Sequence, residues 1–127
     1  MSVLLDTNAL MAPAQFRIDL FDELRLLLGS FEPLVLEDAV KELTGISSGS
    51  GRDSAAARYG LALAEKCTIV NLDEPVHGGV DDQVIAYADK TRCYVVTNDR
   101  HLRKALLARG IGVISMRKQK RLELIQS

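Results

Sequence analysis

The chain has 127 residues, of which 47% are hydrophobic and 26% are charged, and its formal net charge at pH 7 is −1. This length fits one domain of ordinary size, and the composition is that of a globular protein. No uncharged apolar run approaches the roughly 20 residues that a membrane span requires, so no membrane partner is expected. The first residues do not form a basic segment followed by a long apolar one, and we therefore expect a cytoplasmic protein.

The charge is unevenly distributed along the chain. Residues 1–99 contain eight Lys or Arg and sixteen Asp or Glu, whereas residues 100–127 contain eight Lys or Arg and a single acid, Glu123. An acidic body followed by a basic end favours a nucleic acid partner, and a solvated final helix and tail is the alternative. The cations of this end are Arg100, Arg103, Lys104, Arg109, Arg117, Lys118, Lys120 and Arg121.

Strand-like and helix-like segments alternate along the chain. Short runs rich in Val, Ile and Leu predict five strands, at 2–5, 33–36, 67–72, 93–97 and 111–115. Helical patterns follow at 16–28, 37–43, 53–66, 81–90 and 100–110. This order predicts an α/β domain with a mainly parallel five-stranded sheet flanked by helices on both faces. We assign residues 1–116 to this domain and residues 117–127 to a basic tail or short helix.

Acidic side chains stand where strands give way to helices. Asp6 ends the first strand in "VLLDTNAL", and Asp99 ends the fourth in "CYVVTNDRHL". Asp81 and Asp82 begin a helix, and Glu42 lies about one turn into the helix that follows the second strand. Ligand groups of a parallel sheet gather at the carboxyl ends of its strands. We therefore expect these acids to share one site.

The grouping of these acids indicates a metal site. Any one of the aspartates alone would be explained as a helix cap. Several converging carboxylates repel one another, and a bound cation is the simplest compensation. Oxygen ligands favour Mg²⁺ or Mn²⁺, and such an ion can activate a bound water and stabilise phosphate oxygens. Neighbouring groups that could orient the carboxylates, or serve only in strand-end turns, are Thr7, Asn8, Thr97 and Asn98.

The segments "VLLDTNAL", "VKEL", "VDDQVIAYA" and "CYVVTNDRHL" resemble, in order and spacing, the four acidic motifs of the PIN-domain nucleases. The resemblance covers about residues 2–115 and implies a three-layer α/β/α fold, a Mg²⁺- or Mn²⁺-dependent endoribonuclease activity and a homodimer. Asp81 is preferred over Asp82 because Ala88 stands seven residues after it, as the family pattern requires, and Asp82 remains a candidate helper. The catalytic and metal-binding acids that the resemblance implies are Asp6, Glu42, Asp81 and Asp99.

The segment "DDQVIAYADKTRCYVVTNDRHL" is most similar to the PIN nucleases that process ribosomal RNA in archaea and eukaryotes. Toxins of the VapC type share the same acids and a similar length. The expected substrate is therefore single-stranded RNA, with a ribosomal RNA precursor as one candidate. A ribosome-assembly partner and an antitoxin remain alternatives. We expect Arg100, Arg103 and Lys104 to hold the RNA, and Phe21 with Leu26 to contribute to the dimer interface.

Other functions are open at this point. Phosphatases of the haloacid dehalogenase type also place Asp after a first strand, but they need a second Asp where this chain has Asn8. Response-regulator receivers need a late strand-end Lys, which "VVTND" lacks. A catalytically silent module that binds RNA or a ribosome precursor is the non-enzymatic alternative.

Overall fold

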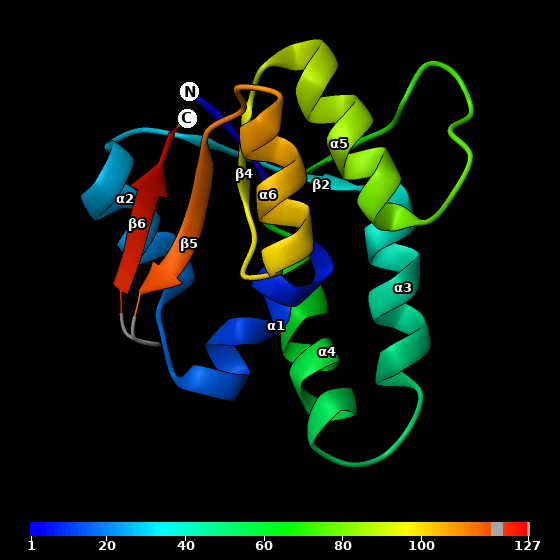
Figure 1. Ribbon diagram of the computed structural model, residues 1–127. Helices are drawn as coiled ribbons and strands as arrows, with labels where there is room; N and C mark the ends of the chain where they lie inside the picture. Colours follow the sequence, from blue (N-terminus) through cyan, green and yellow to red (C-terminus); the bar gives the residue numbers. More distant parts are fainter. Residues whose placement is uncertain (118–120, 127) are drawn as a thin grey trace.

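The computed structural model describes residues 1–117 and 121–126. Its centre is a six-stranded sheet with the order β3-β2-β1-β4-β5-β6 (Figure 1). The strands are β1 (Ser2–Leu5), β2 (Glu32–Leu36), β3 (Thr68–Val70), β4 (Tyr94–Val96), β5 (Val113–Arg117) and β6 (Arg121–Ile125). Neighbouring strands from β3 to β5 are parallel, and β6 is antiparallel to β5. The predicted α/β class is confirmed, with one strand more than expected.

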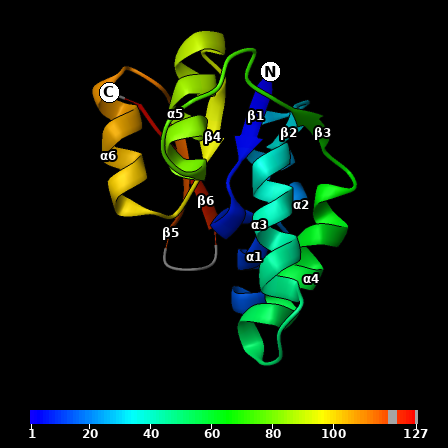
Figure 2. The ribbon, with the colours of Figure 1, turned by 90° about the vertical axis from the view of Figure 1, so that its right-hand side faces the viewer.

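Helices flank both sides of this sheet. They are α1 (Thr7–Phe16), α2 (Leu20–Leu28), α3 (Glu37–Ser47), α4 (Arg52–Ala64), α5 (Val80–Thr91) and α6 (Arg100–Ala108). Helices α5 and α6 lie on one side of the sheet, and α1, α3 and α4 lie together on the other side (Figure 2). None of the described helices has the length and apolar character needed to cross a membrane.

The segment predicted as a single helix, 16–28, is divided between two helices. Helix α1 ends at Phe16, Arg17 adopts a left-handed conformation with φ of 54°, and α2 begins after Asp19. A helix before Phe16 was not predicted. Pro13 lies inside it, where proline removes a backbone donor and disfavours helix on local grounds. Burial of α1 against its neighbours outweighs this local preference.

Helix α4 packs closely against α1 because glycine stands at their contact. A Cβ atom placed on Gly60 would lie 3.0 Å from the carbonyl oxygen of Leu10 and 3.3 Å from Cδ2 of Leu43. Ala56 and Ala57 are also buried on this helix. The alanine-rich sequence of α4 therefore allows a close approach that holds α1 in place.

The C-terminal segment differs from the expected tail or short helix. Arg117 is the last residue of β5, and β6 follows after residues 118–120, which lie outside the described part of the chain. Leu122 and Leu124 pair with Met116 and Ile114 across the two strands and are partly buried. The alternating pattern "RLELI" thus covers the edge of the sheet as a sixth strand.

One residue expected at a dimer interface belongs to the core instead. Phe21 is only 8% exposed, and its ring centroid lies 6.2 Å from that of Phe31. Its burial within the chain leaves it little area for a partner. Leu26, by contrast, is 82% exposed on the outer face of α2.

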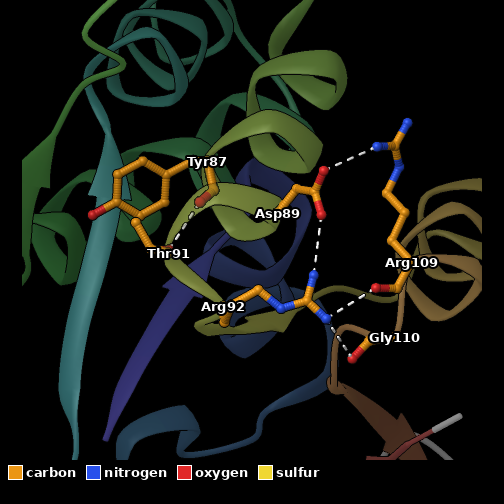
Figure 3. A network of polar contacts seen from close by, with 6 residues as sticks. All are labelled: Tyr87, Asp89, Thr91, Arg92, Arg109 and Gly110. Carbon is orange, nitrogen blue, oxygen red and sulfur yellow. Dashed lines mark hydrogen bonds and ion pairs between the residues drawn. The ribbon is translucent and has the colours of Figure 1, made fainter.

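A polar network joins the ends of α5 and α6 (Figure 3). The guanidinium of Arg92 donates to the Asp89 carboxylate at 3.0 Å and to the carbonyl oxygens of Arg109 and Gly110 at 3.0 and 3.2 Å. Arg109 in turn donates to the same carboxylate at 3.2 Å. The network fixes these two helices relative to each other on one side of the sheet.

Candidate active site

Asp6 is a buried carboxylate at the carboxyl end of β1. Its Oδ1 accepts a hydrogen bond from the backbone N–H of Ala9 at 2.7 Å, which caps α1, and only 4% of the residue is exposed. Burial raises the pKa of Asp6 to about 7, and the nearby carboxylates of Asp81 and Asp99 act in the same direction. Hydrogen bonds from Thr97 and Ala9 oppose this rise without cancelling it. The most buried of the predicted acids is therefore held where its charge is unfavourable.

Asp99 stands at the end of β4 in a similar local structure. Its Oδ1 accepts from the backbone N–H of Leu102 at 2.8 Å and so caps α6. Its own backbone N–H donates to Oγ1 of Thr97 at 3.0 Å. Capping uses one oxygen of the carboxylate, so the cap and a role in ligand binding are compatible at Asp99, as they are at Asp6.

Asp81 and Asp82 are neighbours in sequence but have different surroundings. Oδ2 of Asp82 accepts from the backbone N–H of Gly79 at 3.1 Å and caps α5. The pKa of Asp81 is raised, first by partial burial and then by the charges of Asp99, Glu42 and Asp82. Asp82 therefore stabilises its own helix, whereas Asp81 belongs to the acidic group. This geometry supports the preference for Asp81.

Glu42 joins the group from α3. It is exposed, and it lies close enough to Asp81 to raise the pKa of that residue. Nε2 of Gln83 on α5 donates to Oδ2 of Asp38 at 2.7 Å, one turn before Glu42 on α3. This bond connects the two helices that carry Asp81 and Glu42. Sequence reasoning missed Gln83, whose only signal was its place two residues after an acidic motif.

The acids have no cationic partner within the described chain. The seven ion pairs found there involve none of the four predicted acids. Within residues 1–117 and 121–126, no three His, Cys, Asp or Glu side chains are gathered tightly enough to hold a metal ion as they stand. The oxygen donors and their unbalanced charge nevertheless fit a hard divalent ion, which would have to draw them together. The metal-binding roles of the acids stay a prediction.

Thr97 links two of the acids. Its hydroxyl is fully buried, hydrogen-bonds the side chain of Asp6 and accepts from the backbone N–H of Asp99. Ser115 supports it, because the Ser115 hydroxyl is buried and donates to the carbonyl oxygen of Thr97 at 2.6 Å. Sequence reasoning did not select Ser115, although a polar residue within an apolar strand is a signal of this kind.

The other predicted polar residues have different roles. Oδ1 of Asn98 accepts from the backbone N–H of Met116 at 2.8 Å and so extends the pairing of β4 with β5. Asn8 is exposed. Thr7 is buried, and its hydroxyl has no hydrogen-bond partner in the part of the chain that the structure describes. None of these three contacts a predicted acid through a side-chain hydrogen bond within the described residues.

Cations lie beside the acids on the first turns of α6. Arg100 and Lys104 are exposed and Arg103 is half-buried. These three side chains form no ion pair with the residues that the structure describes. Since Asp99 is the N-cap of α6, unpaired positive charge follows directly after one of the acids.

The family model described as "PIN like domain" matches residues 3–119 of this chain. The chain belongs to the PIN-domain nuclease family. This confirms the resemblance that the four acidic motifs indicated.

Known proteins similar to this PIN-domain chain include enzymes and one complex. Ribonuclease VapC9 of Archaeoglobus fulgidus is 31% identical over 117 residues, which are 91% of this chain and 83% of that protein. The structure of the PIN domain endonuclease Utp24 has a TM-score of 0.79 and 25% identity, covering 99% of this chain and 93% of the other. VapBC2 from Rickettsia felis, bound to a DNA fragment from its promoter, has a TM-score of 0.63 and 15% identity, covering 83% and 93%. This last likeness shows the fold alone.

Proposed function

We propose that this protein is a cytoplasmic endoribonuclease that hydrolyses phosphodiester bonds of single-stranded RNA with the help of Mg²⁺ or Mn²⁺. The observation that carries the proposal is the group of carboxylates at one sheet edge, where the pKa of Asp6 and of Asp81 is raised. Groups of like charges with perturbed pKa values are typical of sites that bind or act on a ligand. The names of two similar proteins, a ribonuclease and an endonuclease, support the same conclusion.

The metal would be held by Asp6, Glu42, Asp81 and Asp99. A bound divalent ion supplies a more acidic water and stabilises charge on the phosphate oxygens. The hydroxyl of Thr97 lies between two of these acids, since it interacts with the Asp6 carboxylate and accepts a hydrogen bond from the backbone N–H of Asp99. Asp82 contributes by fixing the first turn of α5.

The RNA would be held by the cations at the start of α6. Arg100, Arg103 and Lys104 offer positive charge next to the acids, and contacts of this kind bind phosphates without reading sequence. The resemblance of residues 81–102 to PIN nucleases that process ribosomal RNA favours a role in that process, and the overlap with the endonuclease Utp24 along nearly the whole chain supports an endonuclease activity. A toxin with an antitoxin partner is the second candidate, favoured by the identity with VapC9.

We further propose a homodimer. Leu26 is 82% and Leu27 is 37% exposed on α2. These two leucines replace the predicted pair of Phe21 with Leu26. Light scattering of the protein at micromolar concentration tests the dimer, and a monomer there would contradict it.

The test of the activity compares two substitutions of equal charge change. Asp6→Asn keeps an oxygen that can cap α1 but removes the charge from the site. Asp53→Asn removes a charge from the first turn of α4, outside the acidic group, and is the matched control. We expect the wild type and the control to cut single-stranded RNA with Mn²⁺ or Mg²⁺ and to be stopped by EDTA, and Asp6→Asn to be inactive. A folded Asp6→Asn variant with unchanged activity would refute the site, and RNA binding without cleavage under any divalent ion would support the silent module.

A further inference from the structure

The hairpin formed by β5 and β6 places two arginines against each other. Arg117 is the register partner of Arg121 in the antiparallel pair, and both residues are exposed. Like charges directly opposite each other destabilise a strand pair. Glu123 lies 3.8 Å from Arg117, but both side chains are largely open to water, where such a pair is weak. Arg121 forms no ion pair within the described residues, so this end of the hairpin carries positive charge that its folding does not require.

Both arginines project from one face of the sheet. Side chains alternate between faces along a strand. Met116 and Leu122, their neighbours on the two strands, line an apolar cavity together with Ile18 and other residues of the α1 and α2 region. Arg117 and Arg121 therefore lie on the opposite face, where α5 and α6 pack (Figure 2). This is the face that also carries the unpaired cations of α6.

The same pair lies at the edge of the sheet that holds the acids. Strand β5 runs parallel to β4, with Val96 opposite Ile114. Two residues further along β5, the backbone N–H of Met116 donates to Oδ1 of Asn98 at 2.8 Å. Arg117 follows Met116, as Asp99 follows Asn98. The pair of arginines thus stands next to the end of β4 where Asp99 caps α6.

On the other side of the acidic group, beside α3, the surface is negatively charged. A groove between the start of α3 and the segment after β3 is lined by Glu37, Asp38, Asp73 and Glu74. Lys41 and Lys90 pair with three of these acids and compensate them only in part. A polyanion is therefore repelled on the α3 side and attracted on the β5–β6 side.

We propose that Arg117 and Arg121 form, with the cations of α6, a phosphate-binding surface that leads single-stranded RNA to the acids across the β5–β6 hairpin. This proposal rests on the proposed function and adds the path of the substrate to it. The phosphates of the RNA backbone supply the negative charge that compensates the two facing arginines, which the acids of the chain compensate only weakly. The strand then crosses the sheet edge on the hairpin side and avoids the acidic groove beside α3.

RNA binding without cleavage tests this path. We would measure the affinity for a fluorescein-labelled single-stranded RNA of about 12 nucleotides by anisotropy, in EDTA, at several salt concentrations. Each phosphate contact on a single strand contributes about 0.7 to the slope of log affinity against log salt. The double variant Arg117→Gln/Arg121→Gln should lower this slope by about 1.4, so that between about 50 and 200 mM salt it loses about sevenfold less affinity than the wild type. Arg117→Lys/Arg121→Lys should keep most of the slope.

The matched control removes two cations at the opposite edge of the sheet. Arg25 and Lys66 line a groove beside the amino end of β2, so Arg25→Gln/Lys66→Gln changes the net charge equally but should leave the slope unchanged. Urea midpoints show whether each variant folds, and the Arg117→Gln/Arg121→Gln variant should be at least as stable as the wild type, because a repulsive pair is removed. Should the double glutamine variant prove unstable, Arg121→Gln alone, which breaks no ion pair, should lower the slope by about 0.7.

The possible results separate the two proposals. An unchanged slope in the hairpin variant, with a lowered slope after Arg100→Gln/Arg103→Gln, would overturn the hairpin path and leave the RNA function intact. An equal loss in the lysine and glutamine variants, or in the matched control, would also overturn it, since charge at this place would not be the cause. A wild type that does not bind RNA would overturn the proposed function, and the hairpin path with it.

Discussion

Two aspartates of this protein, Asp6 and Asp73, show opposite electrostatic situations. Asp6 is buried beside two other carboxylates, and its pKa is raised to about 7. Asp73 is exposed in the segment after β3, where the hydrogen bond and charge of Lys90 lower its pKa. The charge of an aspartate is thus compensated by a cation at the surface, in Asp73, and left without a cation at the carboxyl edge of the sheet, in Asp6.

The difference shows where the fold tolerates unfavourable electrostatics. Surface acids on α2, α3 and α5 have Lys or Arg neighbours within ion-pair distance. The acids at the sheet edge lie close to one another instead, and none of the described ion pairs includes them. Perturbed pKa values in such a group are typical of functional sites. The contrast can be tested by removing acids from each region.

The largest expected effect is on RNA cleavage, and it should differ between substitutions of the adjacent residues Asp81 and Asp82. Asp81→Ala should lower RNA cleavage by about 10³-fold, the upper range for one electrostatic group, while stability stays the same or rises because repulsion is removed. Asp82→Ala should lower stability by about 1 kcal/mol, because it removes the bond to the Gly79 N–H, and should affect cleavage far less. Single-turnover cleavage and urea unfolding of both variants check this. Equal effects of the two substitutions on cleavage would contradict the assignment of Asp81.

The buried Asp6 predicts a pH dependence of stability. Its pKa of about 7 in the folded chain lies above its ordinary value of 3.8, so the folded state holds the proton more tightly than the unfolded state. The contribution of this group to stability in EDTA is therefore greatest below about pH 4. It falls as the pH rises through 7, by about 4 kcal/mol in all. Asp6→Asn should remove this decline.

Urea unfolding of both proteins between pH 5 and 8 gives the measurement. The wild type should lose stability relative to Asp6→Asn over this range. Parallel curves for the two proteins would show that Asp6 is not held in an unfavourable environment.

Much of the fold could be predicted because parallel strands are continuous apolar runs. Each of the five predicted runs overlaps a strand, and the acids that follow β1 and β4 were selected from their place after these strands. Helix α1 was missed because Pro13 weakens its local signal, and its stability comes from close packing against Gly60 of α4. Strand β6 was missed because an alternation of only two leucines lies within a basic segment.

The site was predictable only in part, for a related reason. A strand end is visible in the sequence, but the partner of a side chain on another helix is not. Gln83 bonds to Asp38, which is 45 positions away, and Ser115 bonds to Thr97 across two strands. Asn98 was grouped with Asn8 as a polar residue near a strand end, yet its side chain accepts from the backbone of β5 because that strand lies beside it. Such roles depend on which elements become neighbours.

Loss of the hydrogen bond between Gln83 and Asp38 should have a moderate effect on stability and on RNA cleavage. Gln83→Ala removes the connection from α5 to α3 and should lower stability by about 1 kcal/mol. Cleavage should fall by about tenfold, because Glu42 and Asp81 are then less well placed relative to each other. Gln83→Glu is the sharper variant, since a carboxylate there would repel Asp38. If cleavage by Gln83→Ala equals that of the wild type at saturating metal, the bond does not position the acids.

The smallest effect is expected at the compensated aspartate. Asp73→Asn leaves a side chain that can still accept a hydrogen bond from Lys90 but removes the charge attraction between them. Exposed ion pairs contribute little to stability because water and salt screen them. Urea unfolding at low and high salt should therefore show no measurable difference from the wild type, and RNA cleavage should be unchanged. A loss of cleavage in Asp73→Asn would mean that the acidic groove beside α3 takes part in the reaction. An aspartate paired with a cation would then belong to the active site as well, and the lack of a cationic partner would no longer distinguish the acids of the site from those outside it.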